Sequence, residues 1–243
     1  MSNYWKLNPK ERFHFFKDIS ADEKNEIINK LLKSCPEVNW PYGMPLSLCA
    51  DLIFVGASPG SSGTDYKVDY KPTFDKAHEG IYYPDTKNYW TNIRKISEKI
   101  IKSTIEDIVN LDPFIFLGHM NLSTEEQGQA KNVVVKSSMA SWVAEIIGLL
   151  RPTCVLLNGL MGHLKGESFN LFNYKTNTID WKKAEKEIYI KDINNKNIII
   201  RIWRRYNTFF IMLPNHTGKP PMTNQDSKNK VFTEIIKYIN DNR

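Results

Sequence analysis

Short apolar segments that stop at glycine or small polar residues recur along this chain and restrict its fold more than any other feature. The segments, rich in β-forming residues, cover 51–56, 113–118, 152–159 and 208–215. Each has the length and composition of a strand that is buried on both faces. Segments with a helical spacing of apolar residues alternate with them, at 88–103, 138–150 and 227–241. This alternation predicts an α/β fold with a mainly parallel central sheet.

Two stretches lie outside the alternation. Residues 9–34 predict two short helices, and Ser20 and Glu23 have the spacing of a capping box at the start of the second. Residues 166–205 contain two β-rich segments that predict a hairpin around Asn194-Asn195. We therefore expect a single domain over 1–243, with a helical extension at 1–45 and a hairpin-containing insertion at about 166–205.

The composition narrows the class of protein. The 243 residues are 41% hydrophobic, enough for an ordinary core, and contain neither an early leader-like segment nor a run of about 18 apolar residues. We therefore expect a cytoplasmic protein, nucleoid-associated in a prokaryote, with no membrane partner. Three scattered cysteines lack the paired spacing of a zinc site. The net charge of +6 is compatible with a polyanion partner, although a solvated lysine-rich surface also explains it.

The loops that follow the four strands are the segments most relevant to function, because ligands of parallel sheets bind beyond the carboxyl ends of the strands. These loops hold small or polar residues, including His119 and His216. The glycine-rich loop at 56–63 lacks both the GxxxxGK[ST] and the GxGxxG pattern. Its Ser58 precedes a proline and does not form a G-x-S-x-G elbow. These absences disfavour a nucleotide-phosphate loop and a hydrolase triad.

Four segments together resemble, in order, the motifs of the uracil-DNA glycosylase superfamily, most closely its mismatch-specific uracil/thymine branch. They are GASPG at 56–60, YYPDTKNYWTNI at 82–93, PTCVLLNG at 152–159 and MLPNHTG at 212–218. The resemblance implies a three-layer α/β sandwich around a four-stranded, mainly parallel sheet. It implies hydrolysis of the N-glycosidic bond of a nucleotide that is flipped out of the duplex, by a monomer that binds DNA and needs no metal and no cofactor.

The resemblance also suggests catalytic residues. Ser58 occupies the position of an asparagine that positions water in the related branch. His216 is expected to donate to the negative charge that develops on the departing base. Serine organises water less well than asparagine, and Asp65, the nearest carboxylate, is a candidate for additional help.

The remaining candidates line a base pocket or contact DNA. The pocket candidates are Gly56, Ala57, Gly60, Tyr83, Asn88, His119 and Asn121. Either His119 or Asn121 takes the place of the residue that reads the base edge. The DNA-contacting candidates are Asn158, Gly218, Lys219, Pro220 and Met222, and the segment 219–222 is expected to wedge into the duplex.

The substrate and the activity stay open at this point. Uracil, a mismatched thymine and a modified pyrimidine all suit such a pocket, and both DNA repair and attack on foreign DNA suit such an enzyme. The serine at position 58 also suits a weak or inactive DNA-binding protein of the same fold. A hydrolase of free nucleosides or nucleotides is a further alternative.

Overall fold

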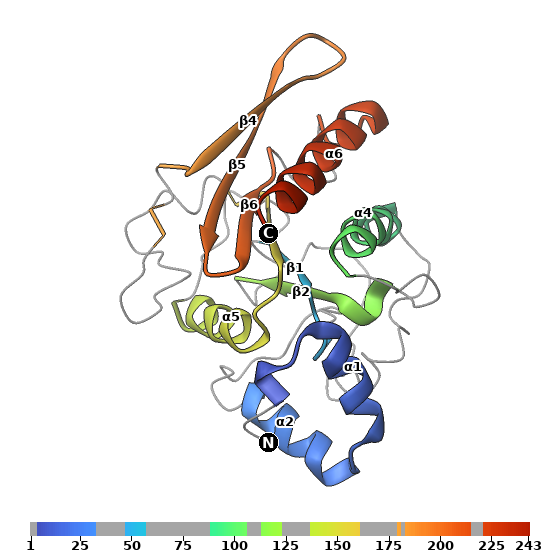
Figure 1. Cartoon of the computed structure of the whole chain (residues 1–243). Helices are drawn as coiled ribbons and strands as arrows, with labels where there is room; N and C mark the ends of the chain where they lie inside the picture. Colours follow the sequence, from blue (N-terminus) through green and yellow to red (C-terminus); the bar gives the residue numbers. More distant parts are fainter. Residues whose placement is uncertain are drawn as a thin grey trace.

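The computed structural model describes residues 4–32, 47–56, 88–105, 113–122, 137–160, 179–180, 183–214 and 221–243. Within these ranges the chain forms an α/β structure around one six-stranded mixed sheet, with the strand order β2-β1-β3-β6-β5-β4 (Figure 1). None of the helices in the described ranges has both the length and the apolar character needed to cross a membrane.

Four neighbouring strands of the sheet are parallel. They are β2 (Leu117–Asn121), β1 (Leu52–Gly56), β3 (Cys154–Asn158) and β6 (Thr208–Met212). Strands β1, β3 and β6 are buried throughout, as their continuous apolar sequence predicts. The expectation of a mainly parallel central sheet is therefore confirmed.

A hairpin enlarges the sheet from the expected four strands to six. Strand β4 (Lys186–Lys191) pairs antiparallel with β5 (Asn197–Arg205), which pairs antiparallel with β6. The hairpin forms around Asn194-Asn195, as the sequence predicts, and Asn195 has a left-handed backbone with φ 60°. The expected total of four is wrong because β5 alternates buried isoleucines, Ile198, Ile200 and Ile202, which join the core on one face of the sheet.

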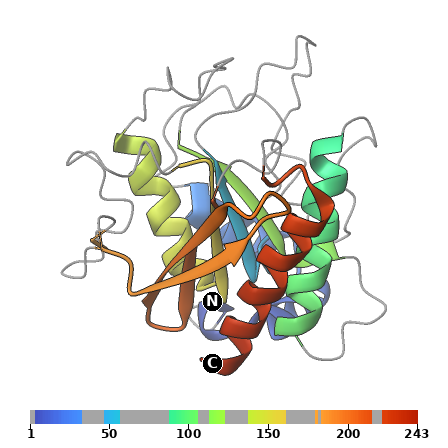
Figure 2. The same ribbon diagram turned by 90° about the horizontal axis from the view of Figure 1, so that it is seen from above.

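Helices cover both faces of the sheet. Helices α4 (Asn88–Thr104) and α6 (Gln225–Asp241) lie side by side on one face, and α5 (Ser137–Leu150) lies on the other (Figure 2). Side chains alternate along β1, so that Ile53 and Val55 join the core on the α5 face while Leu52 and Phe54 join the core on the α4 and α6 face. Strand β1 thus contributes to two apolar clusters, one on each face of the sheet.

The amino-terminal segment packs near the sheet as two short helices, α1 (Pro9–Asp18) and α2 (Ala21–Leu32), after a 3-10 turn η1 (Tyr4–Lys6). The expected capping box is present: the Ser20 amide donates to Glu23 Oε2 at 3.0 Å, and the Glu23 amide donates to Ser20 Oγ at 3.3 Å. A second 3-10 turn, η3 (Pro113–Phe116), leads into β2. Helices α1 and α2 confirm the two short helices that the sequence predicts for residues 9–34.

Candidate functional site

The carboxyl ends of three parallel strands lie in one row at the same end of the sheet. We call this end, where the parallel strands finish, the carboxyl edge of the sheet, and the opposite end, where they begin, the amino edge. Gly56, the last residue of β1, is in register with Asn121 at the end of β2 and with Asn158 at the end of β3. A glycine therefore lies between two asparagine positions that are far apart in sequence. Gly56 has no side chain, so only backbone occupies the middle of this row, and that backbone is buried in the structure.

Backbone hydrogen bonds and one left-handed glycine determine the path of the chain at these strand ends. The Leu122 amide donates to the Gly56 carbonyl at 3.0 Å, and the Leu213 amide donates to the Leu157 carbonyl at 3.1 Å. Gly159 follows Asn158 with φ 73°, a left-handed conformation that a glycine adopts without a steric cost. The chain therefore turns sharply directly after the row, in agreement with the glycine stop read from the sequence.

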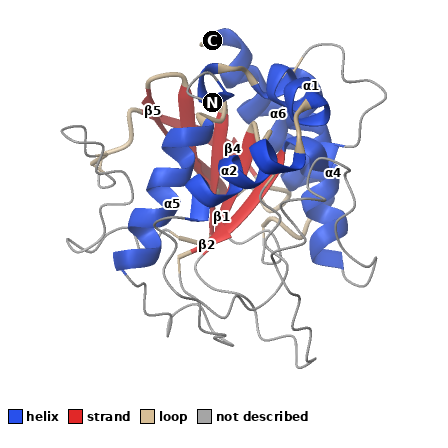
Figure 3. Cartoon of the chain, turned by 90° about the horizontal axis from the view of Figure 1, so that it is seen from below, coloured by secondary structure: helices blue, strands red, loops and turns tan. Residues whose placement is uncertain are grey.

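Two other motif segments reach the same edge. Helix α4 connects β1 to the parallel strand β2, so it runs back along the sheet and begins, at Asn88, on the carboxyl side. Strand β6 ends at Met212 in register with Leu157, and leads directly into the 212–218 segment. All four motif segments thus have a described end on one side of the sheet, viewed from below in Figure 3.

The structure separates the two candidates for reading a base. His119 lies two residues before the end of β2, beside Phe54, and is only 5% exposed. Asn121 is the last residue of β2 and belongs to the row at the edge. Asn158 is 1% exposed, so this strand end keeps a polar side chain within the protein. Of the two alternatives, Asn121 has the position at the edge of the sheet and His119 the position inside it.

The prediction for Met222 is wrong. Its side chain is completely buried and belongs to the apolar cluster that includes Val231 and Phe232 of α6. A residue that enters a base stack has to project from the surface of the free protein. Met222 instead anchors the turn before α6 to the core.

The other candidate residues lie outside the described residues and stay predictions. They are Ala57, Ser58, Gly60, Asp65, Tyr83, His216, Gly218, Lys219 and Pro220.

A buried carboxylate lies at the amino ends of the strands, and the sequence analysis did not identify it. Asp51 is 3% exposed and accepts hydrogen bonds from the Thr153 amide at 3.0 Å, from Thr153 Oγ1 at 2.7 Å and from Thr104 Oγ1 at 2.9 Å. It lies at the amino ends of β1 and β3, away from the row of strand ends, and ties these strands to α4. An aspartate directly before a fully apolar strand is the signal that indicates such a buried, satisfied carboxylate.

The described cysteines do not supply a nucleophile. Burial raises the pKa of the Cys49 thiol to about 12, and burial followed by the neighbouring Asp51 raises the pKa of Cys154 well above its usual value. Both thiols therefore stay protonated near neutral pH. In the ranges that the structure describes, no three His, Cys, Asp or Glu side chains come together as a metal site.

No protein-family model matches the chain, and a search of curated proteins finds no significant match. The function is therefore inferred from the residues and from the geometry of the strand ends.

Proposed function

We propose that this protein is a DNA glycosylase that hydrolyses the N-glycosidic bond of a flipped-out uracil, mismatched thymine or modified pyrimidine. The observation that carries the proposal is the row in which Gly56 lies between Asn121 and Asn158. The proposal places a flat base against the backbone at Gly56, where no side chain takes up space. Asparagine amides offer a donor and an acceptor, the groups needed to read the polar edge of a pyrimidine.

The remaining residues complete the reaction in this proposal. Departure of the base leaves positive charge on the sugar and negative charge on the base. Ser58 helps to hold a water molecule, whose hydroxyl adds to the sugar carbon while its proton balances the anionic base. His216 donates a hydrogen bond to that base as the bond breaks. The mainly parallel part of the six-stranded sheet and the helices on both of its faces support the proposal.

The test is incubation with duplexes that contain uracil, G·T, G·U or modified cytosines. Alkali cleavage of the resulting abasic sites measures turnover, and mass spectrometry identifies the released base. We expect His216→Ala and Ser58→Ala each to lower the rate roughly a hundredfold, the usual size for one transition-state donor or acid-base group. Lys6→Gln, an exposed position in η1, is the control and keeps the full rate.

Three results contradict parts of the proposal. Full activity in both variants removes Ser58 and His216 from the site. No release from any of these bases, together with DNA binding, favours the inactive DNA-binding alternative. Turnover of free nucleosides in the absence of DNA favours the small-molecule hydrolase.

A further inference from the structure

Three lysines gather where helices α4 and α6 lie side by side. Lys95 and Lys99 are exposed and one turn apart on α4, while Lys228, near the start of α6, is only 6% exposed. Lys99 Nζ donates to Asn229 Oδ1 at 3.0 Å and so links the two helices. Burial lowers the pKa of Lys228, and the positive charges of Lys95 and Lys99 lower it further.

Like charges this close oppose each other in the free protein. The nearby carboxylate of Glu98 lies 2.6 Å from Lys102, one turn farther along α4. An anion bound against the cluster would relieve the repulsion among the three ammonium groups, because each of them is attracted to it. The arrangement therefore favours a negatively charged ligand over an uncharged one.

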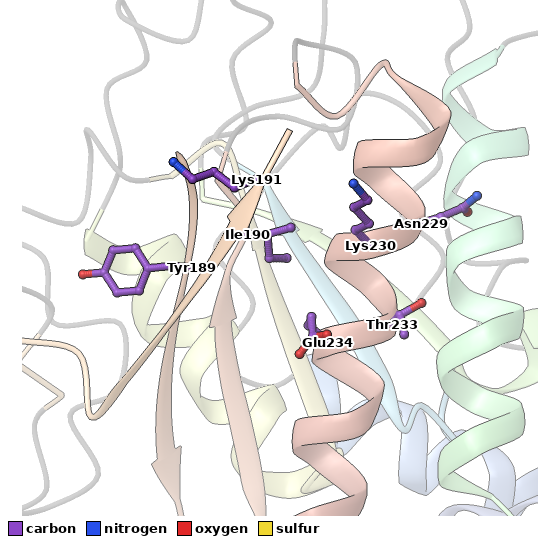
Figure 4. Close-up of a pocket in the computed structure, with 7 residues that line it drawn as sticks. All are labelled: Tyr189, Ile190, Lys191, Asn229, Lys230, Thr233 and Glu234. Atoms are coloured by element: carbon purple, nitrogen blue, oxygen red, sulfur yellow. The ribbon is translucent and has the colours of Figure 1, made fainter. Parts of the chain in front are cut away.

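A groove lies on the other side of α6. It has a volume of about 530 Å³ and lies between Tyr189–Lys191 of β4 and Asn229, Lys230, Thr233 and Glu234 of α6 (Figure 4). The side chains of Tyr189 and Lys191 point away from α6, whereas Lys230 lies on the groove side of the helix (Figure 4). Asn229 belongs to both regions, since it also accepts the hydrogen bond from Lys99. We call the exposed lysines of the two helices, Lys95, Lys99 and Lys230, the basic face.

The basic face flanks the row of strand ends. Helices α4 and α6 follow β1 and β6, so both begin on the carboxyl side of the parallel sheet. Strand β5 runs antiparallel to β6, and its Arg201 pairs with Met212, the last residue of β6. Residues 197–200, which begin β5, therefore lie beyond the carboxyl end of β6. The β4–β5 hairpin therefore projects past the carboxyl ends of the parallel strands.

We propose that the basic face binds the phosphate backbone of a DNA duplex and holds it against the row of strand ends. This inference rests on the proposed function, because it assumes that the edge of the sheet receives a nucleotide. Lysines on two neighbouring helices offer point charges to successive phosphates, and such contacts position a duplex without reading its sequence.

The test is fluorescence anisotropy with a labelled, undamaged duplex across about 50 to 200 mM salt. Two variants remove charges from the basic face: the double variant Lys95→Gln with Lys99→Gln, and a triple variant that adds Lys230→Gln. We expect the double variant to weaken binding roughly tenfold and to lower the slope of log affinity against log salt by about two, and the triple variant to lower that slope further. The control, Lys6→Gln with Lys237→Gln, removes the same charge as the double variant from exposed positions outside the basic face.

The outcomes separate this inference from the proposed function. A salt slope equal to that of the control in both the double and the triple variant overturns the basic face, even where base release continues. A lowered slope in a protein that releases no base supports the basic face and counts against the glycosylase. Restored binding in Lys95→Arg with Lys99→Arg supports a role for charge. Tighter binding to duplex RNA than to duplex DNA overturns the choice of DNA as the partner.

Discussion

At the scale of single residues, Asp51 is the buried polar residue whose contribution to stability is easiest to predict. Its carboxylate accepts hydrogen bonds from two hydroxyls and one backbone amide, which come from two distant segments of the chain. We expect Asp51→Ala to lower the free energy of unfolding by about 3 kcal/mol, because it leaves buried donors without an acceptor. Asp51→Asn keeps one acceptor oxygen and is expected to cost less. Urea unfolding measures both, and equal midpoints for Asp51→Ala and for the exposed Asp18→Ala would contradict the prediction.

The two buried thiols predict a pH effect. Cys49 and Cys154 are fully buried, and burial raises the pKa of each. In the unfolded chain a thiol ionises near its ordinary pKa of about 8.5. Between that pH and about 12 the unfolded state therefore holds fewer protons at Cys49 than the folded state. Stability from this residue is complete below about pH 8.5 and is lost as the pH rises through this range.

Alkylation with iodoacetamide at pH 9, followed by peptide mapping, tests the prediction for the thiols. We expect the peptides that contain Cys49 and Cys154 to stay unmodified in the folded protein and to react in urea. Rapid modification of either cysteine without denaturant would show that its thiol is accessible and ionised.

At the scale of elements, Arg12 fastens the amino-terminal helices to α5. Its side chain is 2% exposed, and Nη1 donates to the carbonyl of Leu150, the last residue of α5, at 2.6 Å. A cation at a helix carboxyl terminus both satisfies a free carbonyl and complements the helix dipole. We expect Arg12→Met to lower the free energy of unfolding by about 2 to 3 kcal/mol, through the lost bond and the unsatisfied carbonyl.

Thermal unfolding and limited proteolysis check the role of Arg12. Cleavage within 4–32 is expected to speed up in Arg12→Met before the rest of the chain becomes sensitive. Lys6→Met, which removes an exposed charge from the neighbouring η1, serves as the comparison. A melting temperature unchanged from that of the comparison would mean that the contact contributes little.

The same elements show what local sequence can predict. The strands, the Ser20–Glu23 capping box and the hairpin turn at Asn194-Asn195 follow from residues that are neighbours in the chain. The place of the hairpin in the sheet depends on the pairing of β5 with β6 and on buried isoleucines that pack against α6. The burial of Met222 likewise depends on distant partners. Such long-range packing leaves no periodic signal within a short segment.

At the scale of the whole molecule, part of the candidate site could be predicted from the local sequence, and part depends on residues that are distant in the chain. Sequence reasoning predicted that the loops after the strands matter, because parallel strands place their carboxyl ends on one side. It left His119 and Asn121 as alternatives, and only the register with Gly56 distinguishes them. It did not find the basic face, since Lys99 and its partner Asn229 are 130 positions apart in the sequence.

The two edges of the sheet have different roles in the proposed function, and this division predicts how variants respond to DNA. Asp51, Thr104 and Thr153 connect strands and helix at the amino edge, while Gly56, Asn121 and Asn158 form the row at the carboxyl edge. A duplex with an abasic-site analogue, at about a hundred times its dissociation constant, is expected to stabilise the wild type by about 2.7 kcal/mol. Asp51→Asn should lower the melting temperature and keep nearly the whole DNA-induced increase.

Asn158→Ala should behave in the opposite way. Its DNA-induced increase in melting temperature is expected to shrink, because the lost amide belongs to the row at which the flipped nucleotide is held. Any purely structural cost of the substitution appears equally with and without DNA, and it cancels in the difference between the two melts. Differential scanning fluorimetry of the three proteins, with and without the duplex, measures this difference. A full increase in Asn158→Ala, or its loss in Asp51→Asn, would mean that DNA does not bind at the carboxyl edge.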